Sequence, residues 1–212
     1  MKDEIFESIP QRGSGEEVAE NCRIYEVIDE LHRRCQLYEA QLRDGQKHVN
    51  RLDLEQRVAE LYAKENGLWL TMDCVMNLGV PGPSGNENDT YVSNNTIYKV
   101  NNLLNSGSIT GLLKKIILHN RLFYETSYSL YAFTGFDGRT VMPVLQQHLV
   151  KDALPATSIE IDTYMAALGF VKQNREGHFV NKSYEVWDLV PRNVLRDREG
   201  DIYIVDAEIK EL

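Results

Sequence analysis

The sequence is poor in cysteine, with only Cys22, Cys35 and Cys74, which form neither an even set nor a CxxC pair. We therefore expect no disulfide framework, and a reducing cytoplasm fits this cysteine content. His32 and Cys35 lie one helical turn apart, but no second pair of ligands follows them, so a zinc site is not predicted.

A long hydrophobic run is also missing. No apolar stretch approaches the roughly 18 residues that a membrane span requires, and the opening MKDEIFESIP lacks the basic and apolar segments of a signal peptide. Basic residues are scarce as well: 23 Lys and Arg stand against 32 Asp and Glu, a formal net charge of -9. Because nucleic-acid binding needs a basic face, we expect a cytoplasmic protein with neither a nucleic-acid nor a membrane partner.

The N-terminal region divides into two parts. Residues 1–15 mix charge with Pro, Gly and Ser and predict a flexible tail, whereas residues 16–66 predict a helical extension. In the second helix, over 53–66, Asp53 is the expected cap and Gln56 the capping-box residue. The first helix carries an apolar stripe that either docks on the rest of the chain or mediates self-association; it comprises Val18, Cys22, Tyr25, Ile28, Leu31, Cys35, Tyr38 and Leu42.

The remainder of the chain alternates between strands and helices without a βαβ repeat. Residues 90–100 predict a hairpin and 109–123 a helix, and two further strands flank the Asp137-Gly138 turn. A helix capped by Thr157 or Ser158 comes next, and three short strands end the chain. This order predicts an α+β fold.

The segment most informative about function is YEVWDLVPRNVLRDREGDIYIVDAEI, residues 184–209. Asp188 ends an apolar strand, Asn193 follows five residues later, and Asp206 ends the next apolar run. We expect a hairpin to bring these three side chains to one edge of a sheet. Phosphoryl transfer needs such an edge, because Mg²⁺ prefers hard oxygen ligands and the attacking hydroxyl needs a nearby carboxylate. The alternative interpretation is ordinary strand-end and turn chemistry.

WDLVPRNVL together with IYIVDAE resembles the catalytic loop and the metal-binding aspartate of the protein-kinase-like fold, in the form found in aminoglycoside and other small bacterial phosphotransferases. With SGNENDTYV, IYKV and LHNRLF added, the sequence most resembles the compact kinase domain of polyvalent proteins of bacterial phages and conjugative elements. The resemblance runs from Leu68 to the C-terminus. It implies a minimal bilobal fold, with an antiparallel N-lobe sheet and one helix over residues 67–149 and a reduced C-lobe over 150–212.

The resemblance implies ATP and Mg²⁺ as cofactors. Asp188 would orient and deprotonate the acceptor hydroxyl, Asn193 and Asp206 would bind the metal, and Lys99 would hold the α- and β-phosphates. The remaining nucleotide contacts would come from a loop over the phosphates and from backbone groups that read the adenine edge; the residues are Gly82, Ser84, Gly85, Gln147 and Leu149.

The sequence departs from the kinase pattern in the helix that should supply a glutamate to pair with the strand lysine. Residues 102–123 contain no acidic side chain. Either Glu125, Glu87 or His119 substitutes for this glutamate, or Lys99 has no such partner. Glu208, two residues after Asp206, is either a second metal ligand or an exposed acid.

These departures keep two other functions open. One is a pseudokinase, which binds nucleotide or a protein without catalysis, and the other is an assembly module that oligomerises through the first helix. The phosphate acceptor of the kinase would be a protein or a small molecule. The N-terminal helices are expected to pack against the small second lobe.

Overall fold

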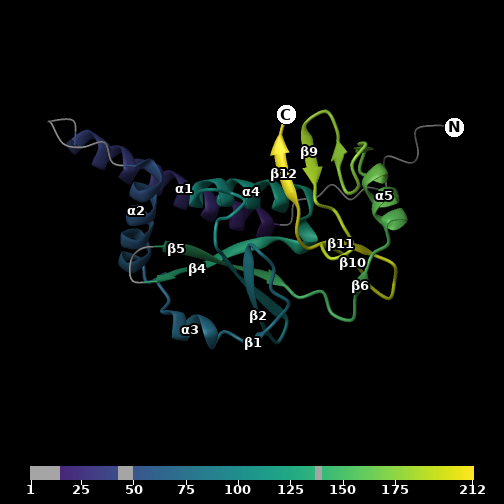
Figure 1. Cartoon of the computed structure of the whole chain (residues 1–212), viewed down its shortest axis with the longest axis horizontal. Coiled ribbons are helices and arrows are strands. Elements are labelled where there is room, and N and C mark those ends of the chain that lie inside the picture. The colour runs from purple at the N-terminus through teal and green to yellow at the C-terminus, as the bar shows by residue number, and fades with distance from the viewer. Residues whose placement is uncertain (1–14, 43–49, 137–139) are drawn as a thin grey trace.

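The computed structural model describes residues 15–42, 50–136 and 140–212, which form two lobes side by side (Figure 1). Antiparallel sheets and helices make up both lobes, so the fold is α+β, as predicted, and matches a small bilobal kinase-like domain. The N-lobe contains α1 (Gly15–Leu42), α2 (Arg51–Glu65), α3 (Met72–Met76), β1 (Val80–Pro81), β2 (Asn88–Ser93), β3 (Thr96–Asn101), α4 (Ile109–Leu122), β4 (Tyr128–Phe136) and β5 (Thr140–His148).

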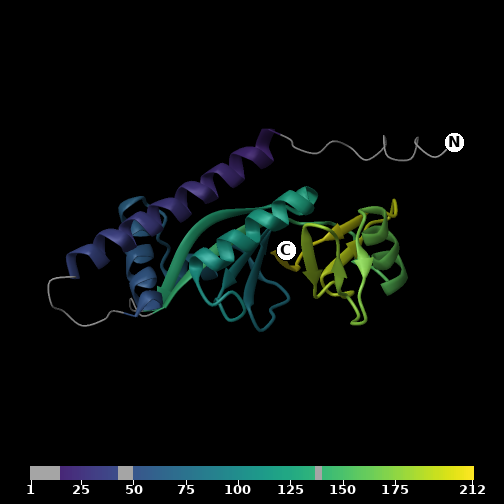
Figure 2. The same ribbon diagram turned by 90° about the horizontal axis from the view of Figure 1, so that it is seen from above.

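The N-lobe is built on one antiparallel sheet in the order β1-β2-β3-β5-β4, with β3 at its centre. Side chains alternate between the two faces of its strands. On β5, Val141 and Leu145 face a core shared with α1, α2 and α4, whereas Met142 and Val144 pack with Val75 of α3. The long helices thus cover one face of the sheet, and α1 runs alongside α4 (Figure 2).

Helix α1 is part of the N-lobe core. Its buried apolar residues are Ile24, Val27, Ile28 and Leu31, and they pack with α2, α4 and β4. Hydrogen bonds from Asn120 to Asn21 and from Arg121 to Tyr25 join α1 to the end of α4. The expectation that the N-terminal helices pack against the second lobe was therefore wrong, because their apolar faces belong to the first lobe. Self-association through α1 stays a prediction.

The sequence placed the buried face of α1 and the start of α2 inaccurately. Cys22 and Tyr25 of the predicted stripe are exposed. The N-cap of α2 is Asn50, whose side chain accepts from Leu52 N. Gln56 bonds the backbone of Val141 on β5 in both directions instead of completing a capping box. The long-range bonds to β5 thus replace the local capping interaction that was predicted for Gln56.

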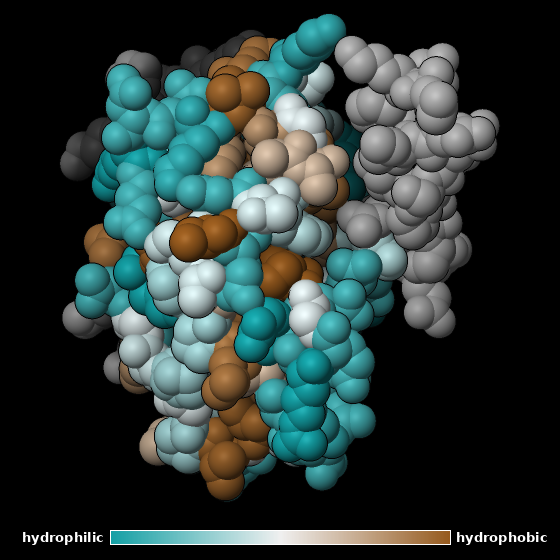
Figure 3. Space-filling model, turned by 90° about the vertical axis from the view of Figure 1, so that its right-hand side faces the viewer, coloured by the Kyte–Doolittle hydropathy of each residue, from teal (hydrophilic) through white to brown (hydrophobic). Residues whose placement is uncertain are grey.

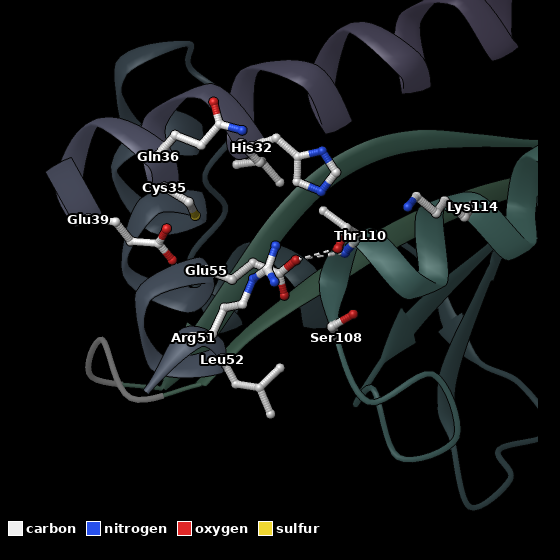
Figure 4. A pocket seen from close by; sticks show the side chains of 11 residues that line it. His32, Cys35, Gln36, Glu39, Arg51, Leu52, Glu55, Ser108, Thr110 and Lys114 are labelled. Carbon is white, nitrogen blue, oxygen red and sulfur yellow. Dashed lines mark hydrogen bonds between the residues drawn. The ribbon is translucent and has the colours of Figure 1, made fainter. Parts of the chain in front are cut away.

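Glu55 links α2 to the first turn of α4, as Figure 4 shows. Its buried carboxylate accepts hydrogen bonds from Ile109 N at 3.0 Å, Thr110 N at 3.1 Å and Thr110 Oγ1 at 2.6 Å. The free N–H groups of a helix N-terminus favour a negative charge at this position. Glu55 also lines a cavity of about 370 Å³ enclosed by α1, α2 and α4.

Replacing Glu55 with alanine is expected to lower the free energy of unfolding by about 2 kcal/mol, because three donors lose a charged acceptor at a buried helix end. Urea denaturation of the purified protein measures the change. Glu39→Ala is the matched control, since Glu39 lines the same cavity from α1 and is exposed. It should stay within about 0.5 kcal/mol of wild type. Equal losses in the two variants would contradict a capping role for Glu55.

The C-lobe is smaller and consists mainly of short strands. One sheet has the order β11-β10-β6 and the other β12-β9-β8-β7. Of the two caps predicted for α5, Thr157 is the one observed, and it forms a capping box with Glu160. The elements are β6 (Leu154–Pro155), α5 (Ser158–Ala167), β7 (Val171–Lys172), β8 (Phe179–Val180), β9 (Tyr184–Trp187), β10 (Val194–Arg196), β11 (Ile202–Ile204) and β12 (Glu208–Glu211).

The surface of the molecule includes apolar side chains as well as charged ones. Figure 3 shows hydrophobic residues in an uneven band on the face at the C-lobe end. Leu154, Ile159 and Val171 are the large exposed apolar residues of this lobe apart from the C-terminal Leu212.

Within the described part of the chain, no helix is both long and apolar enough to cross a membrane. The predicted Asp137-Gly138 turn lies outside the described residues, but β4 and β5 on either side of it pair as expected.

Candidate active site

Asp188 follows directly on β9 and has a backbone φ of 62°, a left-handed conformation that is uncommon outside glycine but tolerated by Asp and Asn. Its carboxylate accepts from Arg192 Nη2 at 2.8 and 3.1 Å and from Asn193 Nδ2 at 2.9 Å. Asn193 Nδ2 also donates to the backbone carbonyl of Asp188 at 2.8 Å. The five-residue spacing therefore closes a tight loop in which the two side chains meet.

Gly177 supports this loop from behind and was not singled out in the sequence. Its φ is 67°, and a Cβ there would lie 2.7 Å from the carbonyl oxygen of Leu189. The Leu189 N–H donates to the Gly177 carbonyl at 3.1 Å. Only glycine allows both the conformation and this close backbone approach, so Gly177 helps to fix the residue that follows Asp188.

Asp206 lies beside Asn193 through backbone contacts. Val205 N donates to Asn193 O at 2.9 Å and Asp206 N to the same oxygen at 3.4 Å. β10 and β11 pair as a hairpin, but β9, which precedes Asp188, pairs with β8 and β12 in another sheet. The expected single hairpin edge was therefore wrong in topology. The three residues meet because the 188–193 loop crosses between the two sheets.

Lys99 reaches the same point from the centre of the N-lobe sheet. Its Nζ donates to the carbonyl oxygen of Val205 at 2.8 Å and to the Tyr128 hydroxyl at 2.6 Å. Burial lowers the pKa of Lys99, while the Asp206 carboxylate acts in the opposite direction and favours the charged form. The lysine is therefore placed one residue from Asp206, across the boundary between the lobes.

The carbonyl oxygens that precede Asp206 are held by several N-lobe side chains. Val205 O also accepts from the Tyr128 hydroxyl at 2.6 Å and from Gln147 Nε2 at 3.4 Å, and Ile204 O accepts from Thr126 Oγ1 at 2.5 Å. Because these groups are buried, their hydrogen bonds fix the end of β11 against the N-lobe. Tyr128 and Thr126 were not identified from the sequence.

The residues predicted to read adenine are engaged inside the protein. The backbone of Gln147 lies within the sheet, paired with Ile97 of β3 and Tyr128 of β4, and its buried side chain donates to Thr126 O at 2.6 Å. The Leu149 N–H donates to Asn95 O at 2.8 Å. Adenine contacts at Gln147 and Leu149 stay a prediction, and in this conformation the Leu149 N–H would have to exchange its partner. A cavity of about 380 Å³ adjoins the linker between β5 and β6, residues 149–153, and is lined by Leu149, Lys151 and Tyr203 among others.

The predicted phosphate loop lies at the turn between β1 and β2. Gly82 N donates to Thr90 O at 2.9 Å, Ser84 Oγ accepts from Thr90 N at 3.3 Å, and Gly85 N donates to Asn88 O at 3.0 Å. A Cβ on Gly82 would lie 2.7 Å from Thr90 Oγ1, so this position favours glycine. The loop thus occupies the expected place in the sheet, while its contact with phosphates stays a prediction.

Among the described residues, none of the three proposed substitutes for the missing helix glutamate bonds Lys99. His119 is buried, and its Nε2 lies 3.2 Å from both the carbonyl oxygen and Oγ1 of Thr126. Its ring lies edge-on to Tyr128, and burial lowers its pKa to about 3, so it is neutral. Glu125 lines the cavity at the linker. Glu87 lies 3.8 Å from Lys115 of α4, whose Nζ bonds Glu208 at 3.0 Å. The helix therefore faces the site with a lysine, which the sequence analysis missed.

The side chains around Asp206 suit a magnesium ion. With its Nδ2 fixed on Asp188, Asn193 keeps its amide oxygen free, and in the described part of the chain no hydrogen-bond donor reaches that oxygen or the Asp206 carboxylate. No group of three or more His, Cys, Asp or Glu side chains in the same part could hold a metal. Mg²⁺ commonly takes one or two protein ligands and completes its shell with water and phosphate, so this small donor set fits it.

Comparison with known proteins identifies the family. The model of the serine/threonine/tyrosine kinases found in polyvalent proteins matches residues 53–211, and no curated protein matches the chain. The matched region begins in the first turn of α2, ends in β12 and contains both lobes with Lys99, Asp188, Asn193 and Asp206. Residues 1–52, which include α1 and the first two residues of α2, and Leu212 lie outside it. The resemblance is thus confirmed, and the match extends it upstream from Leu68 into α2. The chain belongs to the serine/threonine/tyrosine kinases found in polyvalent proteins.

Proposed function

We propose that this kinase-family chain is an ATP- and Mg²⁺-dependent phosphotransferase. One observation carries the proposal: hydrogen bonds connect the four motif residues in a continuous series. Lys99 bonds the carbonyl of Val205, the N–H groups of Val205 and Asp206 bond the Asn193 carbonyl, and the Asn193 amide bonds Asp188. These contacts bring together a cation from the N-lobe and, from the C-lobe, the carboxylate and amide groups that we propose as the base and the metal ligands.

Each residue has a distinct role in the proposal. Asn193 and Asp206 would hold Mg²⁺, which supplies charge neutralisation to the phosphates when bound. Lys99 would hold the α- and β-phosphates, and the backbone of the 82–85 turn would cover them. Asp188 would orient the acceptor hydroxyl and accept its proton, after Arg192 releases the carboxylate. Arg192 is 70% exposed in its side chain, so this ion pair contributes little and opens readily.

A pseudokinase is the second candidate function. Two observations favour it. Arg192 forms an ion pair with the carboxylate that would act as the base, and no acidic side chain among the described residues bonds Lys99. Nucleotide binding is expected in both cases, whereas ATP turnover separates them.

Thermal melting with ATP and Mg²⁺, each alone and together, tests the proposal. At about a hundred times the dissociation constant, binding adds about 2.7 kcal/mol, or on the order of 5–10 °C for a chain of this size. We expect the shift to require Mg²⁺ and to be lost in Asp206→Asn, because the amide lacks the charge that holds the metal.

Asp201→Asn is the matched control, since Asp201 is an exposed aspartate at the other end of β11. It should keep the full shift. If the wild type shows no shift under any condition, the proposal is overturned in favour of a module that binds no nucleotide. A shift that Asp206→Asn retains would contradict the metal role of Asp206.

A further inference from the structure

Helix α4 presents a lysine to the site where the kinase resemblance leads one to expect a glutamate. The Lys115 side chain is 12% exposed, and its Nζ lies 3.0 Å from Glu208 Oε1. Glu208 is the first residue of β12, two positions after Asp206. The ion pair therefore joins the middle of α4 to the strand that leaves the proposed metal site.

Glu87 brings a third element to this ion pair. It lies just before β2, at the end of the turn that contains Gly82 and Gly85, and its Oε1 is 3.8 Å from Lys115 Nζ. That oxygen is buried and has no hydrogen-bond partner among the described residues, whereas Oε2 accepts from Asn105 Nδ2 at 2.9 Å. Asn105 Nδ2 also lies 3.4 Å from Glu208 Oε1 and so bridges the two carboxylates.

An unpaired carboxylate oxygen at a buried position is unfavourable, and a cation already lies just beyond hydrogen-bonding distance of it. A small movement of the 82–87 turn towards α4 would complete the bond from Lys115 to Glu87. Burial lowers the pKa of Lys115, but the charges of Glu208, Asp206 and Glu87 outweigh burial and raise it. Lys115 therefore stays charged and neutralises the acidic side chains around it.

We propose that Lys115 is a positioning residue of the phosphotransferase site, tying Asp206 through Glu208, and the phosphate loop through Glu87, to helix α4. The inference rests on the proposed function and deepens it. The charges of this ion pair are reversed relative to the kinase pattern, in which the helix supplies a glutamate. Here the helix supplies the cation, and the segment after the proposed metal-binding aspartate supplies the acid. Without the Lys115–Glu208 ion pair, the strand that begins two residues after Asp206 would lose its connection to α4, and Asp206 would be held less firmly in position for Mg²⁺.

The test measures the Mg²⁺ concentration that gives half of the ATP-dependent melting shift, at saturating ATP. We expect Lys115→Met to raise this concentration about tenfold, and Glu208→Gln to raise it by a similar factor. The double variant should resemble either single variant, because both changes break the same ion pair. Lys115→Arg, which keeps the charge, should recover most of the wild-type Mg²⁺ response.

Lys114→Met is the matched control, since Lys114 is the exposed neighbour on the same helix and lines the cavity shown in Figure 4, away from Glu208. It should leave the Mg²⁺ response unchanged. A purely structural role of Lys115 would lower the melting temperature without ligand but leave the half-saturating Mg²⁺ concentration at the wild-type value, and that result overturns the inference.

The two proposals fail in different ways. If the wild type gives no ATP and Mg²⁺ response, the proposed function itself is wrong. If the wild type responds and both Lys115→Met and Glu208→Gln behave like Lys114→Met, only the positioning role is wrong. Should Lys115→Met fail to fold, Glu208→Gln against Glu211→Gln gives the same comparison on β12, because Glu211 is exposed and bonds Arg121 instead.

Discussion

Asp188→Asn is expected to slow phosphoryl transfer by roughly 10²–10⁴-fold, while the affinity for ATP and Mg²⁺ stays within about twofold of wild type. The amide is nearly isosteric with the carboxylate but accepts no proton from an attacking hydroxyl. Since Asp188 has no proposed contact with the nucleotide, its replacement should act on the chemical step and not on nucleotide binding.

Asparagine is the informative substitution because of the backbone at this position. With φ at 62°, alanine would add strain, whereas asparagine tolerates the left-handed region. The bond from Asn193 Nδ2 to the carbonyl of residue 188 does not involve the altered side chain, so the loop should persist. Arg192 loses a charged partner, but this exposed pair contributes little to stability.

ATP turnover by the purified protein, to water or to its own side chains, provides the measurement, and the melting shift with ATP and Mg²⁺ monitors binding in the same samples. Asp152→Asn is the control, because Asp152 is also an aspartate at positive φ, 54°, and lies in the exposed linker. It should turn over ATP at the wild-type rate. If Asp188→Asn turns over ATP at the wild-type rate, another group acts as the base. If the wild type and Asp188→Asn are equally inactive, the pseudokinase is favoured.

Local sequence signals predicted much of the fold. The 109–122 helix begins at a serine whose side chain bonds Gly111 N, α5 begins with a Thr157–Glu160 capping box, and the β2–β3 turn contains Asn94 at positive φ. Each of these features depends on residues within one turn of one another. The sequence therefore contains the information that determines them.

The errors occurred where distant residues decide the structure. Gln56 bonds β5 across 85 positions, so its local capping-box pattern was misleading. β12 has no clear strand signal in EIKE and forms because it pairs with β9 beside α4. Lys115 and Glu208 are 93 positions apart, and neither has a local pattern that indicates an ion pair. The motif residues were identifiable because of the family resemblance, whereas their supporting contacts required the three-dimensional arrangement.

The environment of Lys99 leads to a second large expected effect. Lys99→Met is expected to reduce ATP turnover by about 10²-fold or more, because a neutral side chain cannot hold the α- and β-phosphates. The melting temperature without ligand, in contrast, should not fall. Methionine fills a similar volume, and replacing a buried charge with an apolar group removes a desolvation penalty.

The hydrogen bonds around Val205 explain why stability should be kept. When Lys99 is replaced, the Val205 carbonyl still accepts from Tyr128 and Gln147, so no buried acceptor is left unpaired. Tyr128→Phe provides the opposite case. It removes the shorter of these two bonds and also the hydroxyl that accepts from Lys99 Nζ, but leaves the cation in place. We expect it to cost about 2 kcal/mol of stability while retaining nucleotide binding.

Melting curves with and without ATP and Mg²⁺, recorded for both variants, separate a functional lysine from a structural one. A functional Lys99 gives a methionine variant that is as stable as wild type but shows little nucleotide-dependent shift, and a Tyr128→Phe variant with a lower melting temperature and a normal shift. The reverse pattern, an unstable Lys99→Met that binds ATP normally, would assign the buried cation to the packing of β11 against the N-lobe. In that case the phosphates would need another cation, and Lys115, the second lysine whose charge acts on Asp206, would be the first to test.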